Sequence, residues 1–283
     1  ALYAEKWDVA AQAARDCATA EGNLDLSKNG YAKIFELGIN SPEVLFAVEF
    51  KSSVIDHAYD AYVRPSGDTK ELGKQVYSGF VPTSELVDSY EMAGDGGNFS
   101  WEKHGKDPYA NREPRFYATI LYNGADWMGR KIESFVGGKD GYKAYENAGA
   151  AGTTVTGYYL RKYLIDGDKT WVTSGSGQDW IVLRYAEVLL NKAEALAMEN
   201  WNKNSAEALQ ALNDVRARVG LPARATADKE TFLEYVRHER KVELAGEGFR
   251  YWDLRRWRLA EKVIDGQNVH GVKISKQSDG SFT

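Results

Sequence analysis

The chain has 283 residues, of which 43% are hydrophobic and 27% charged, and its formal net charge is −5. These values are typical of a globular protein that is long enough to bury a large core. They disfavour a nucleic-acid-binding protein, which normally carries a basic face, and no apolar run reaches the roughly 18 residues that a membrane-spanning helix needs. Aromatic residues are frequent, with 8 tryptophans and 17 tyrosines, and several of them lie among glycines.

The first twenty residues predict a helix. Tyr3, Trp7, Ala10 and Ala14 recur at spacings of three and four residues, and Gly22 ends the pattern. The helix starts without a capping residue or a signal peptide before it, so we expect a fragment that is cut at both ends. A single cysteine, Cys17, can form neither an internal disulfide nor a cysteine-based metal site, and we expect it in the core.

Residues 44–50 form a short apolar run rich in β-branched and aromatic side chains, which predicts a strand. A short helix is predicted at 83–87, where Thr83 follows Pro82 and stands at the N-cap position.

The segment from 91 to 157 has a different character. It contains 12 of the 27 glycines together with several large aromatic residues, and only 116–122 and 131–135 resemble strands. Loop-rich regions with large aromatic side chains are frequent locations of binding sites. We therefore expect a ligand-binding region here.

The last hundred residues predict four helices. Asp179 is the expected N-cap of the first, and Ser205 that of the second, which ends at Gly220-Leu221-Pro222 in a Schellman-type stop. Two such helices joined by a short turn form the hairpin from which TPR-like arrays are stacked. The third helix is predicted over 228–245 and the fourth over 250–264.

Acids and arginines alternate from Glu239 to Trp257. Arginine forks and carboxylates commonly join consecutive helices, so we interpret this cluster as structural, with Arg184 and Glu187 as further members. The tryptophans in helical patterns are expected in the core; they are Trp7, Trp180, Trp252 and Trp257.

The sequence does not complete a zinc-protease motif or a dinucleotide-binding motif. His238-Glu239 lacks the second histidine of a zinc-protease motif because Val242 stands in its place, and Trp180 interrupts the glycine pattern of a dinucleotide loop. We expect no metal and no cofactor. A pair of carboxylates for glycoside hydrolysis stays open as an alternative; the acids in the loop region are Asp95, Glu102, Glu113 and Asp126.

Ordered sequence blocks resemble the SusD/RagB family of outer-membrane nutrient-binding lipoproteins from Bacteroidetes. The blocks run from 184 to 195, 212 to 222 and 239 to 257, and upstream blocks lie at 82–88, 111–116 and 157–163. The block that begins with Arg184-Tyr185-Ala186-Glu187 resembles the family's signature, and the other matches, among them Tyr251-Trp252-Asp253-Leu254-Arg255-Arg256-Trp257, follow in the expected order. Residues 1–20 resemble a helix of the family's TPR-like array.

The resemblance implies a mainly α-helical fold, with TPR-like hairpins packed against an irregular, loop-rich region that has a few short strands. It implies one SusD-like domain, in which 1–40 are TPR-like helices, 41–178 the ligand-binding region and 179–265 the helical scaffold. It also implies a lipoprotein on the extracellular face of the outer membrane, anchored by a lipid on a part absent from this chain. Such a protein captures a nutrient, usually an oligosaccharide, for a SusC-like TonB-dependent transporter, without catalysis.

The family's shared motifs are scaffold, so candidate ligand residues are chosen by their chemistry. An oligosaccharide needs flat aromatic rings that stack on its C–H faces, and polar groups that bind its hydroxyls. Trp101 is the first choice, beside Asn98 and Phe99, just after the glycines at 94–97. Trp127 with Asp126 is the second, and a third cluster comprises His57, Tyr59 and Tyr62.

We therefore predict a non-catalytic carbohydrate-binding protein. The same scaffold binding a peptide or another nutrient is the nearest alternative. An all-helical glycoside hydrolase and a scaffolding TPR-like module are further alternatives.

Overall fold

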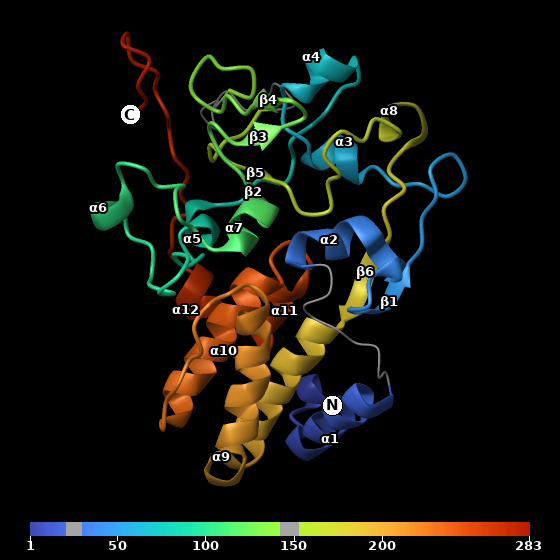
Figure 1. Ribbon diagram of the computed structural model, residues 1–283, viewed down its shortest axis with the longest axis vertical. Helices are drawn as coiled ribbons and strands as arrows, with labels where there is room; N and C mark the ends of the chain where they lie inside the picture. Colours follow the sequence, from blue (N-terminus) through green and yellow to red (C-terminus); the bar gives the residue numbers. More distant parts are fainter. Residues whose placement is uncertain (21–29, 142–152) are drawn as a thin grey trace. The chain divides into compact units, whose positions relative to one another are not determined.

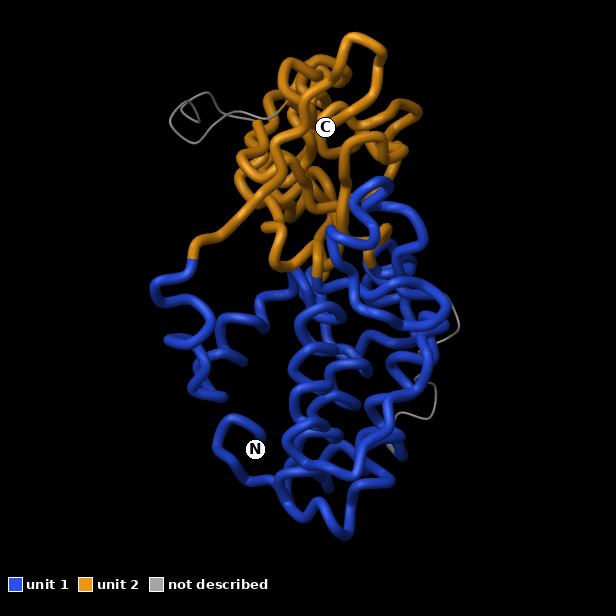
Figure 2. The backbone as a smooth tube through the Cα atoms, turned by 90° about the vertical axis from the view of Figure 1, so that its left-hand side faces the viewer, with its two compact units in different colours: residues 1–48, 89–115, 180–267 blue, residues 49–88, 116–179, 268–283 orange. Residues whose placement is uncertain are grey.

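The computed structural model describes residues 1–20, 30–141 and 153–283, and it is mainly helical with a few short strands. The predicted fold class is confirmed. Two compact units divide the chain, as the colours of Figure 2 show. Unit 1 comprises 1–48, 89–115 and 180–267, and unit 2 comprises 49–88, 116–179 and 268–283. None of the helices in the described ranges combines the length and the apolar character that crossing a bilayer requires.

Unit 1 begins with a short 3-10 helix at Leu2–Ala4 and the helix α1 at Trp7–Ala20. The helix predicted over 1–20 is confirmed from Trp7 onward, and Glu5 interrupts it in the left-handed conformation at a φ of 54°. Cys17 is half-buried, and Gly22 lies outside the described residues. Helix α2 at Gly30–Leu37 and a second 3-10 helix at Gly38–Asn40 follow.

Strand β1 at Val44–Val48 confirms the strand predicted over 44–50, and it pairs antiparallel with β6 at Trp180–Arg184. This pairing makes the prediction of a helix capped by Asp179 wrong. The Asp179 carboxylate accepts a hydrogen bond from the Phe50 amide at 3.2 Å, and the helix begins only at Tyr185. The run 180–184 carries aromatic and branched side chains that suit a strand, and β1 supplies the backbone partner.

Helix α9 runs from Tyr185 to Arg218 and breaks at Asn200, whose φ of −164° and ψ of 94° are not helical. The Asn200 side chain accepts from the Lys203 amide at 3.2 Å, so Asn200, and not Ser205, caps the second half. The predicted hairpin of two helices is present. Its predicted stop is confirmed, because Gly220 has a φ of 72° and the Leu221 amide donates to the Arg216 carbonyl at 3.1 Å.

Helix α10 at Lys229–Glu243 confirms the helix predicted over 228–245, and the Asp228 carboxylate caps it by accepting from the Thr231 amide. Helices α1 and α10 both pack against α9 (Figure 1), around a core of small and branched side chains that includes Leu189, Leu196, Leu212 and Val236.

The fourth predicted helix is two helices, α11 at Phe249–Arg256 and α12 at Ala260–Ile264, because Arg258 adopts a φ of 57° between them. Trp252 is 54% exposed, so its assignment to the core is wrong. Trp7, Trp180 and Trp257 are half-buried.

Unit 2 has only short regular elements. Its helices are α3 at Tyr59–Val63, α4 at Asp68–Leu72, α5 at Ser84–Val87 and α8 at Trp171–Ser174. Two-residue strands pair antiparallel, β2 at Ile120–Leu121 with β5 at Tyr159–Leu160, and β3 at Asp126–Trp127 with β4 at Arg130–Lys131.

Two strand predictions in this region need correction. Most of the segment 116–122 belongs to helix α7 at Pro114–Thr119, which begins with a proline in the position that helices favour, and only Ile120–Leu121 are extended. The strand expected over 131–135 is reduced to β4. Thr83 precedes α5 as predicted, but its side chain makes no capping hydrogen bond.

Candidate functional site

Trp101 opens the one-turn helix α6 at Trp101–His104 in unit 1. The Ser100 hydroxyl caps this turn by accepting from the Lys103 amide at 3.4 Å. The Trp101 side chain is 43% exposed, whereas the preceding Phe99 is buried. The two rings meet edge to face with centroids 5.4 Å apart, so the buried phenylalanine supports the exposed indole.

Arg112 holds this segment from below. Its guanidinium lies 4.1 Å from the centroid of the Phe99 ring and donates to the carbonyls of Tyr90 at 2.8 Å and Pro108 at 3.1 Å. Phe99 also stacks on His104, with centroids 5.5 Å apart. A buried cation that binds two backbone carbonyls and a ring fixes the loop, so Trp101 stands on a defined support.

The polar residues next to Trp101 face solvent. Asn98, Glu102 and Lys103 are exposed, and they provide amide, carboxylate and ammonium groups of the kinds that bind sugar hydroxyls. The preceding turn is ordered by Asp95, whose carboxylate accepts from the Gly97 amide at 2.9 Å. An exposed aromatic ring and exposed hydrogen-bonding groups thus share one short segment.

The structure corrects the prediction for Trp127. Its ring is 0% exposed, and its Nε1 donates to the Asp68 carboxylate at 3.0 Å. A ring without exposed surface cannot stack on a ligand, so Trp127 is a core residue of unit 2. Asp126 is exposed and forms an ion pair of 2.7 Å with Lys131 across the β3–β4 turn.

Tyr59 is half-buried and uses its hydroxyl inside the protein, where it donates to the Lys162 carbonyl at 2.8 Å. Burial raises the pKa of the Tyr59 hydroxyl, so it stays protonated. His57 contacts Tyr59 edge to face, and its Nε2 lies 2.9 Å from the Gln178 carbonyl. These two residues fasten one segment of unit 2 to another and offer little to a ligand.

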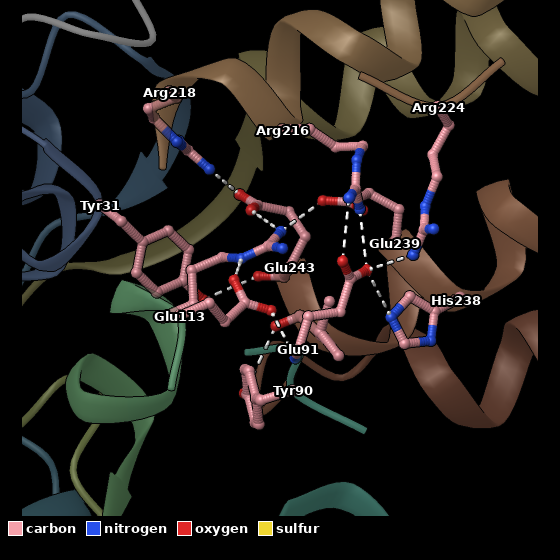
Figure 3. Close-up of polar contacts among 12 residues, drawn as sticks. Tyr31, Tyr90, Glu91, Glu113, Arg216, Arg218, Arg224, His238, Glu239 and Glu243 are labelled. Carbon is pink, nitrogen blue, oxygen red and sulfur yellow. Dashed lines mark hydrogen bonds and ion pairs between the residues drawn. The ribbon is translucent and has the colours of Figure 1, made fainter. Parts of the chain in front are cut away.

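The charged cluster that the sequence places on the C-terminal helices is a buried ion-pair network in unit 1 (Figure 3). Arg115 donates to Glu113 at 2.6 Å, to Glu239 at 2.5 Å and to Glu243 at 2.9 Å. Other arginines are paired with acids in the same way, and the pairs are Arg216 with Glu91 and Glu239, Arg184 with Glu43, Glu243 and Glu247, Arg218 with Glu43 and Glu243, Arg224 with Glu91, Arg240 with Asp253, and Arg256 with Glu194 and Asp253. The structural interpretation of this cluster is confirmed.

Two effects shift the pKa values of the carboxyl groups in this network in opposite directions. Burial raises these pKa values, and hydrogen bonds from arginine lower them. Burial disfavours the charged form of Glu91, but the hydrogen bonds from Arg216 and His238 and the charges of Arg216 and Arg224 together outweigh it and hold the Glu91 pKa well below its usual value. Burial raises the pKa of Glu113 although Arg115 favours its ionised form. A carboxyl with a raised pKa is a familiar general acid, but Glu113 is fully buried and therefore inaccessible to a substrate. The described residues contain no group of three or more potential metal ligands.

Sequence reasoning missed one surface feature. Tyr62, named above with Tyr59, stacks on Tyr77 at the surface of unit 2, with ring centroids 5.1 Å apart. Fourteen residues separate the two tyrosines, and no short motif links them, so only the folded chain brings them together.

Comparisons with known proteins agree with this architecture. Over 133 residues, 44% of this chain, the sequence is 32% identical to a SusD-like protein of Formosa agariphila, of which the match covers 25%. A SusD-like protein of Bacteroides fragilis has a structure with a TM-score of 0.79 and 25% identity, over 100% of this chain and 56% of that one.

A second solved structure, described as a SusD-like carbohydrate binding protein of Bacteroides fragilis, has a TM-score of 0.78 and 26% identity. The similarity covers 99% of this chain and 53% of that one. The chain thus spans about half the length of these two solved structures, and its match to the curated relative covers a quarter of that protein. Residues 42–283 match the SusD family. The chain therefore belongs to the SusD family.

Proposed function

We propose that this chain is part of a cell-surface protein that binds an oligosaccharide or polysaccharide nutrient without catalysis. In this proposal the whole protein is a lipoprotein on the outer face of the outer membrane and passes its ligand to a SusC-like TonB-dependent transporter. Membership of the SusD family supports this role, as does the likeness to a protein described as carbohydrate binding.

The observation that carries the proposal is the exposed indole of Trp101 on its buried support. The Trp101 side chain is 43% exposed, and its ring meets the buried Phe99 ring, which in turn rests on the Arg112 guanidinium. A flat apolar ring next to the amide of Asn98 matches a pyranose, which has an apolar C–H face and a rim of hydroxyls. The proposed site is therefore Trp101 with Asn98 and the Glu102 carboxylate.

The test measures binding to laminarin, xylan, starch and alginate by affinity electrophoresis and isothermal titration, with casein peptides for the peptide alternative. We expect the wild-type chain to bind at least one polysaccharide and Trp101→Ala to weaken that binding about tenfold or more. The melting temperature of this variant should fall by no more than about 4 °C, because the ring is a partly exposed side chain. Trp252→Ala removes another exposed tryptophan and serves as the control.

Three outcomes contradict the proposal. Unchanged affinity in Trp101→Ala rejects the site, and binding of peptides without any polysaccharide rejects the carbohydrate. Release of sugar products in excess of the protein during long incubation rejects the non-catalytic role. Delivery to a transporter is tested separately, by isolating the whole protein from its native membrane and identifying the proteins that remain bound to it.

A further inference from the structure

Two tyrosines form a stacked pair on the surface of unit 2. The rings of Tyr62, on α3, and Tyr77, in the extended segment after α4, lie at an interplanar angle of 26° with centroids 5.1 Å apart. Each is close to half exposed, 47% for Tyr62 and 44% for Tyr77. Other tyrosines of this unit are buried, among them Tyr158, Tyr159 and Tyr163. Among the tyrosines that the structure describes in unit 2, Tyr62 and Tyr77 are therefore the exposed ones.

The backbone beneath the pair is held firmly. The Tyr77 amide donates to the Ala61 carbonyl at 2.7 Å, and the Gly79 amide donates to the Tyr62 carbonyl at 2.7 Å. Between them Ser78 adopts a left-handed conformation with a φ of 48°, and its buried hydroxyl donates to the Arg64 carbonyl at 2.9 Å. These hydrogen bonds fix the backbone segments that carry the two rings.

The hydroxyl groups of Tyr62 and Tyr77 are available for hydrogen bonds to a ligand. In the described part of the chain, neither the Tyr62 nor the Tyr77 hydroxyl makes a hydrogen bond to protein. By contrast, the Tyr59 hydroxyl donates to the Lys162 carbonyl, and the Tyr159 hydroxyl donates to the Asp140 carbonyl at 2.9 Å. The stacked pair thus offers two ring surfaces and two hydroxyls to whatever approaches from solvent.

We propose that Tyr62 and Tyr77 form a carbohydrate-binding platform in unit 2. A pyranose unit packs its apolar C–H face on the exposed ring surface, while the phenolic hydroxyls bind the hydroxyls at the rim of the sugar. This inference rests on the proposed function for the class of ligand, but on different residues from Trp101. It assigns a glycan contact to a surface of unit 2 that includes neither Trp127 nor Tyr59.

Nitration by tetranitromethane tests the platform directly on the whole chain. The reagent modifies exposed tyrosines, and peptide mass spectrometry reports the modified fraction at each site. We expect saturating laminarin, xylan, starch or alginate, whichever the chain binds, to reduce nitration of Tyr62 and Tyr77 about fivefold or more, since burial by a bound sugar blocks access. Tyr251, an exposed tyrosine of α11, is the internal control and should react equally with and without polysaccharide.

Substitutions separate the rings from their hydroxyls. Tyr62→Ala with Tyr77→Ala removes the rings and should weaken binding about tenfold or more, whereas Tyr62→Phe with Tyr77→Phe keeps the rings and should weaken it only a few-fold. Tyr251→Ala is the matched control and should leave affinity unchanged. The paired phenylalanine variant keeps the stacked rings. If the alanine variant folds poorly, the phenylalanine variant still measures the contribution of the two hydroxyls to binding.

The outcomes distinguish this inference from the proposed function. Binding of a polysaccharide with full nitration of Tyr62 and Tyr77 overturns the platform and leaves the function standing. A chain that binds no polysaccharide and shows no protection overturns both. A proline-rich peptide can also stack on tyrosine rings. Protection by polyproline and by none of the four polysaccharides overturns the assignment to carbohydrate.

Discussion

The two units bury charged side chains in different ways. In unit 1, buried arginines bind carboxylates, as Arg216 does with Glu91 through two hydrogen bonds of 2.9 Å. In unit 2, much of the buried charge binds the backbone. Arg64 pairs with Asp60 at 2.8 Å and also donates to the carbonyls of Ile165 and Asp168. The Asp140 carboxylate pairs with Arg130 and also accepts from the amides of Gly67 and Glu133, both at 2.9 Å.

The difference follows from regular structure. A helix satisfies most of its own peptide groups, so the helices of unit 1 leave their charged side chains available to pair with one another. The irregular segments of unit 2 leave amides and carbonyls without secondary-structure partners, and buried peptide groups need partners. Side chains supply them there. Ion pairs therefore join the helices of unit 1, and side chains hold loops in unit 2 and, through Arg112, in unit 1 as well.

The largest loss of stability is expected from a substitution that breaks the ion-pair network of unit 1. Arg115→Met leaves Glu113, Glu239 and Glu243 buried without this cation, and we expect the free energy of unfolding to fall by about 3–5 kcal/mol. Urea denaturation followed by circular dichroism measures it. Arg15→Met, at the partly exposed pair with Glu207, should cost less than about 1 kcal/mol. Equal losses in the two variants would show that the network is not a special source of stability.

Unit 2 is tested through Asp140. Asp140→Asn replaces one oxygen with an amide group that faces a donor, because Arg130 and the amides of Gly67 and Glu133 all donate to this carboxylate. We expect a loss of about 1–3 kcal/mol in the free energy of unfolding. Asp126→Asn, at an exposed ion pair in the same unit, should leave the urea midpoint unchanged. A silent Asp140→Asn would contradict the role of side chains in holding these loops.

Acid should weaken unit 1 through Glu91. Its pKa in the folded chain lies below the ordinary value of 4.5, so its ionised form stabilises the fold above pH 4.5 and loses this effect as the pH falls further. Glu91→Gln should therefore cost about 1–3 kcal/mol at pH 7, and the difference from wild type should shrink below pH 4.5. Urea titrations between pH 3 and 7 measure this difference. A difference that does not change with pH would refute the assignment to the carboxylate charge.

The smallest expected effect concerns the break in α9 at Asn200. Asn200→Ala removes the acceptor of the Lys203 amide and should cost about 1 kcal/mol. Asn200→Asp keeps an acceptor and should restore most of that loss. The thermal midpoint of each variant provides the measurement, and identical midpoints for both would argue against a cap at this position.

Much of the helical unit could be predicted from periodicity. Helix α10, its N-cap Asp228 and the stop at Gly220 follow from local patterns of apolar, capping and glycine residues. The first turns of the predicted helix at 179 could not, because Trp180–Arg184 pair with a strand more than a hundred residues earlier in the chain. Likewise, α7 replaces an apolar stretch that resembles a strand. The local sequence pattern determines whether a segment is a helix or a strand only where no distant segment of the chain pairs with it.

The candidate site was predictable to a smaller extent. A tryptophan after a glycine-rich turn indicates a loop, but nothing in its neighbours distinguishes Trp101, which faces solvent, from Trp127, which is buried over Asp68. Both follow short polar segments. The exposed fraction of a loop side chain depends on what the rest of the chain places over it, and that is not encoded within a few residues.

The sequence by itself determined the mainly helical class, the helical hairpin, the structural nature of the arginine–glutamate cluster and the family. Periodicity, capping residues and ordered sequence blocks are local properties, and they can be recognised in the sequence alone. Only the tertiary structure decided which aromatic rings are exposed, that Asn200 breaks α9, and that Tyr62 meets Tyr77. These features depend on contacts between residues far apart in the chain, which form only when the whole chain packs.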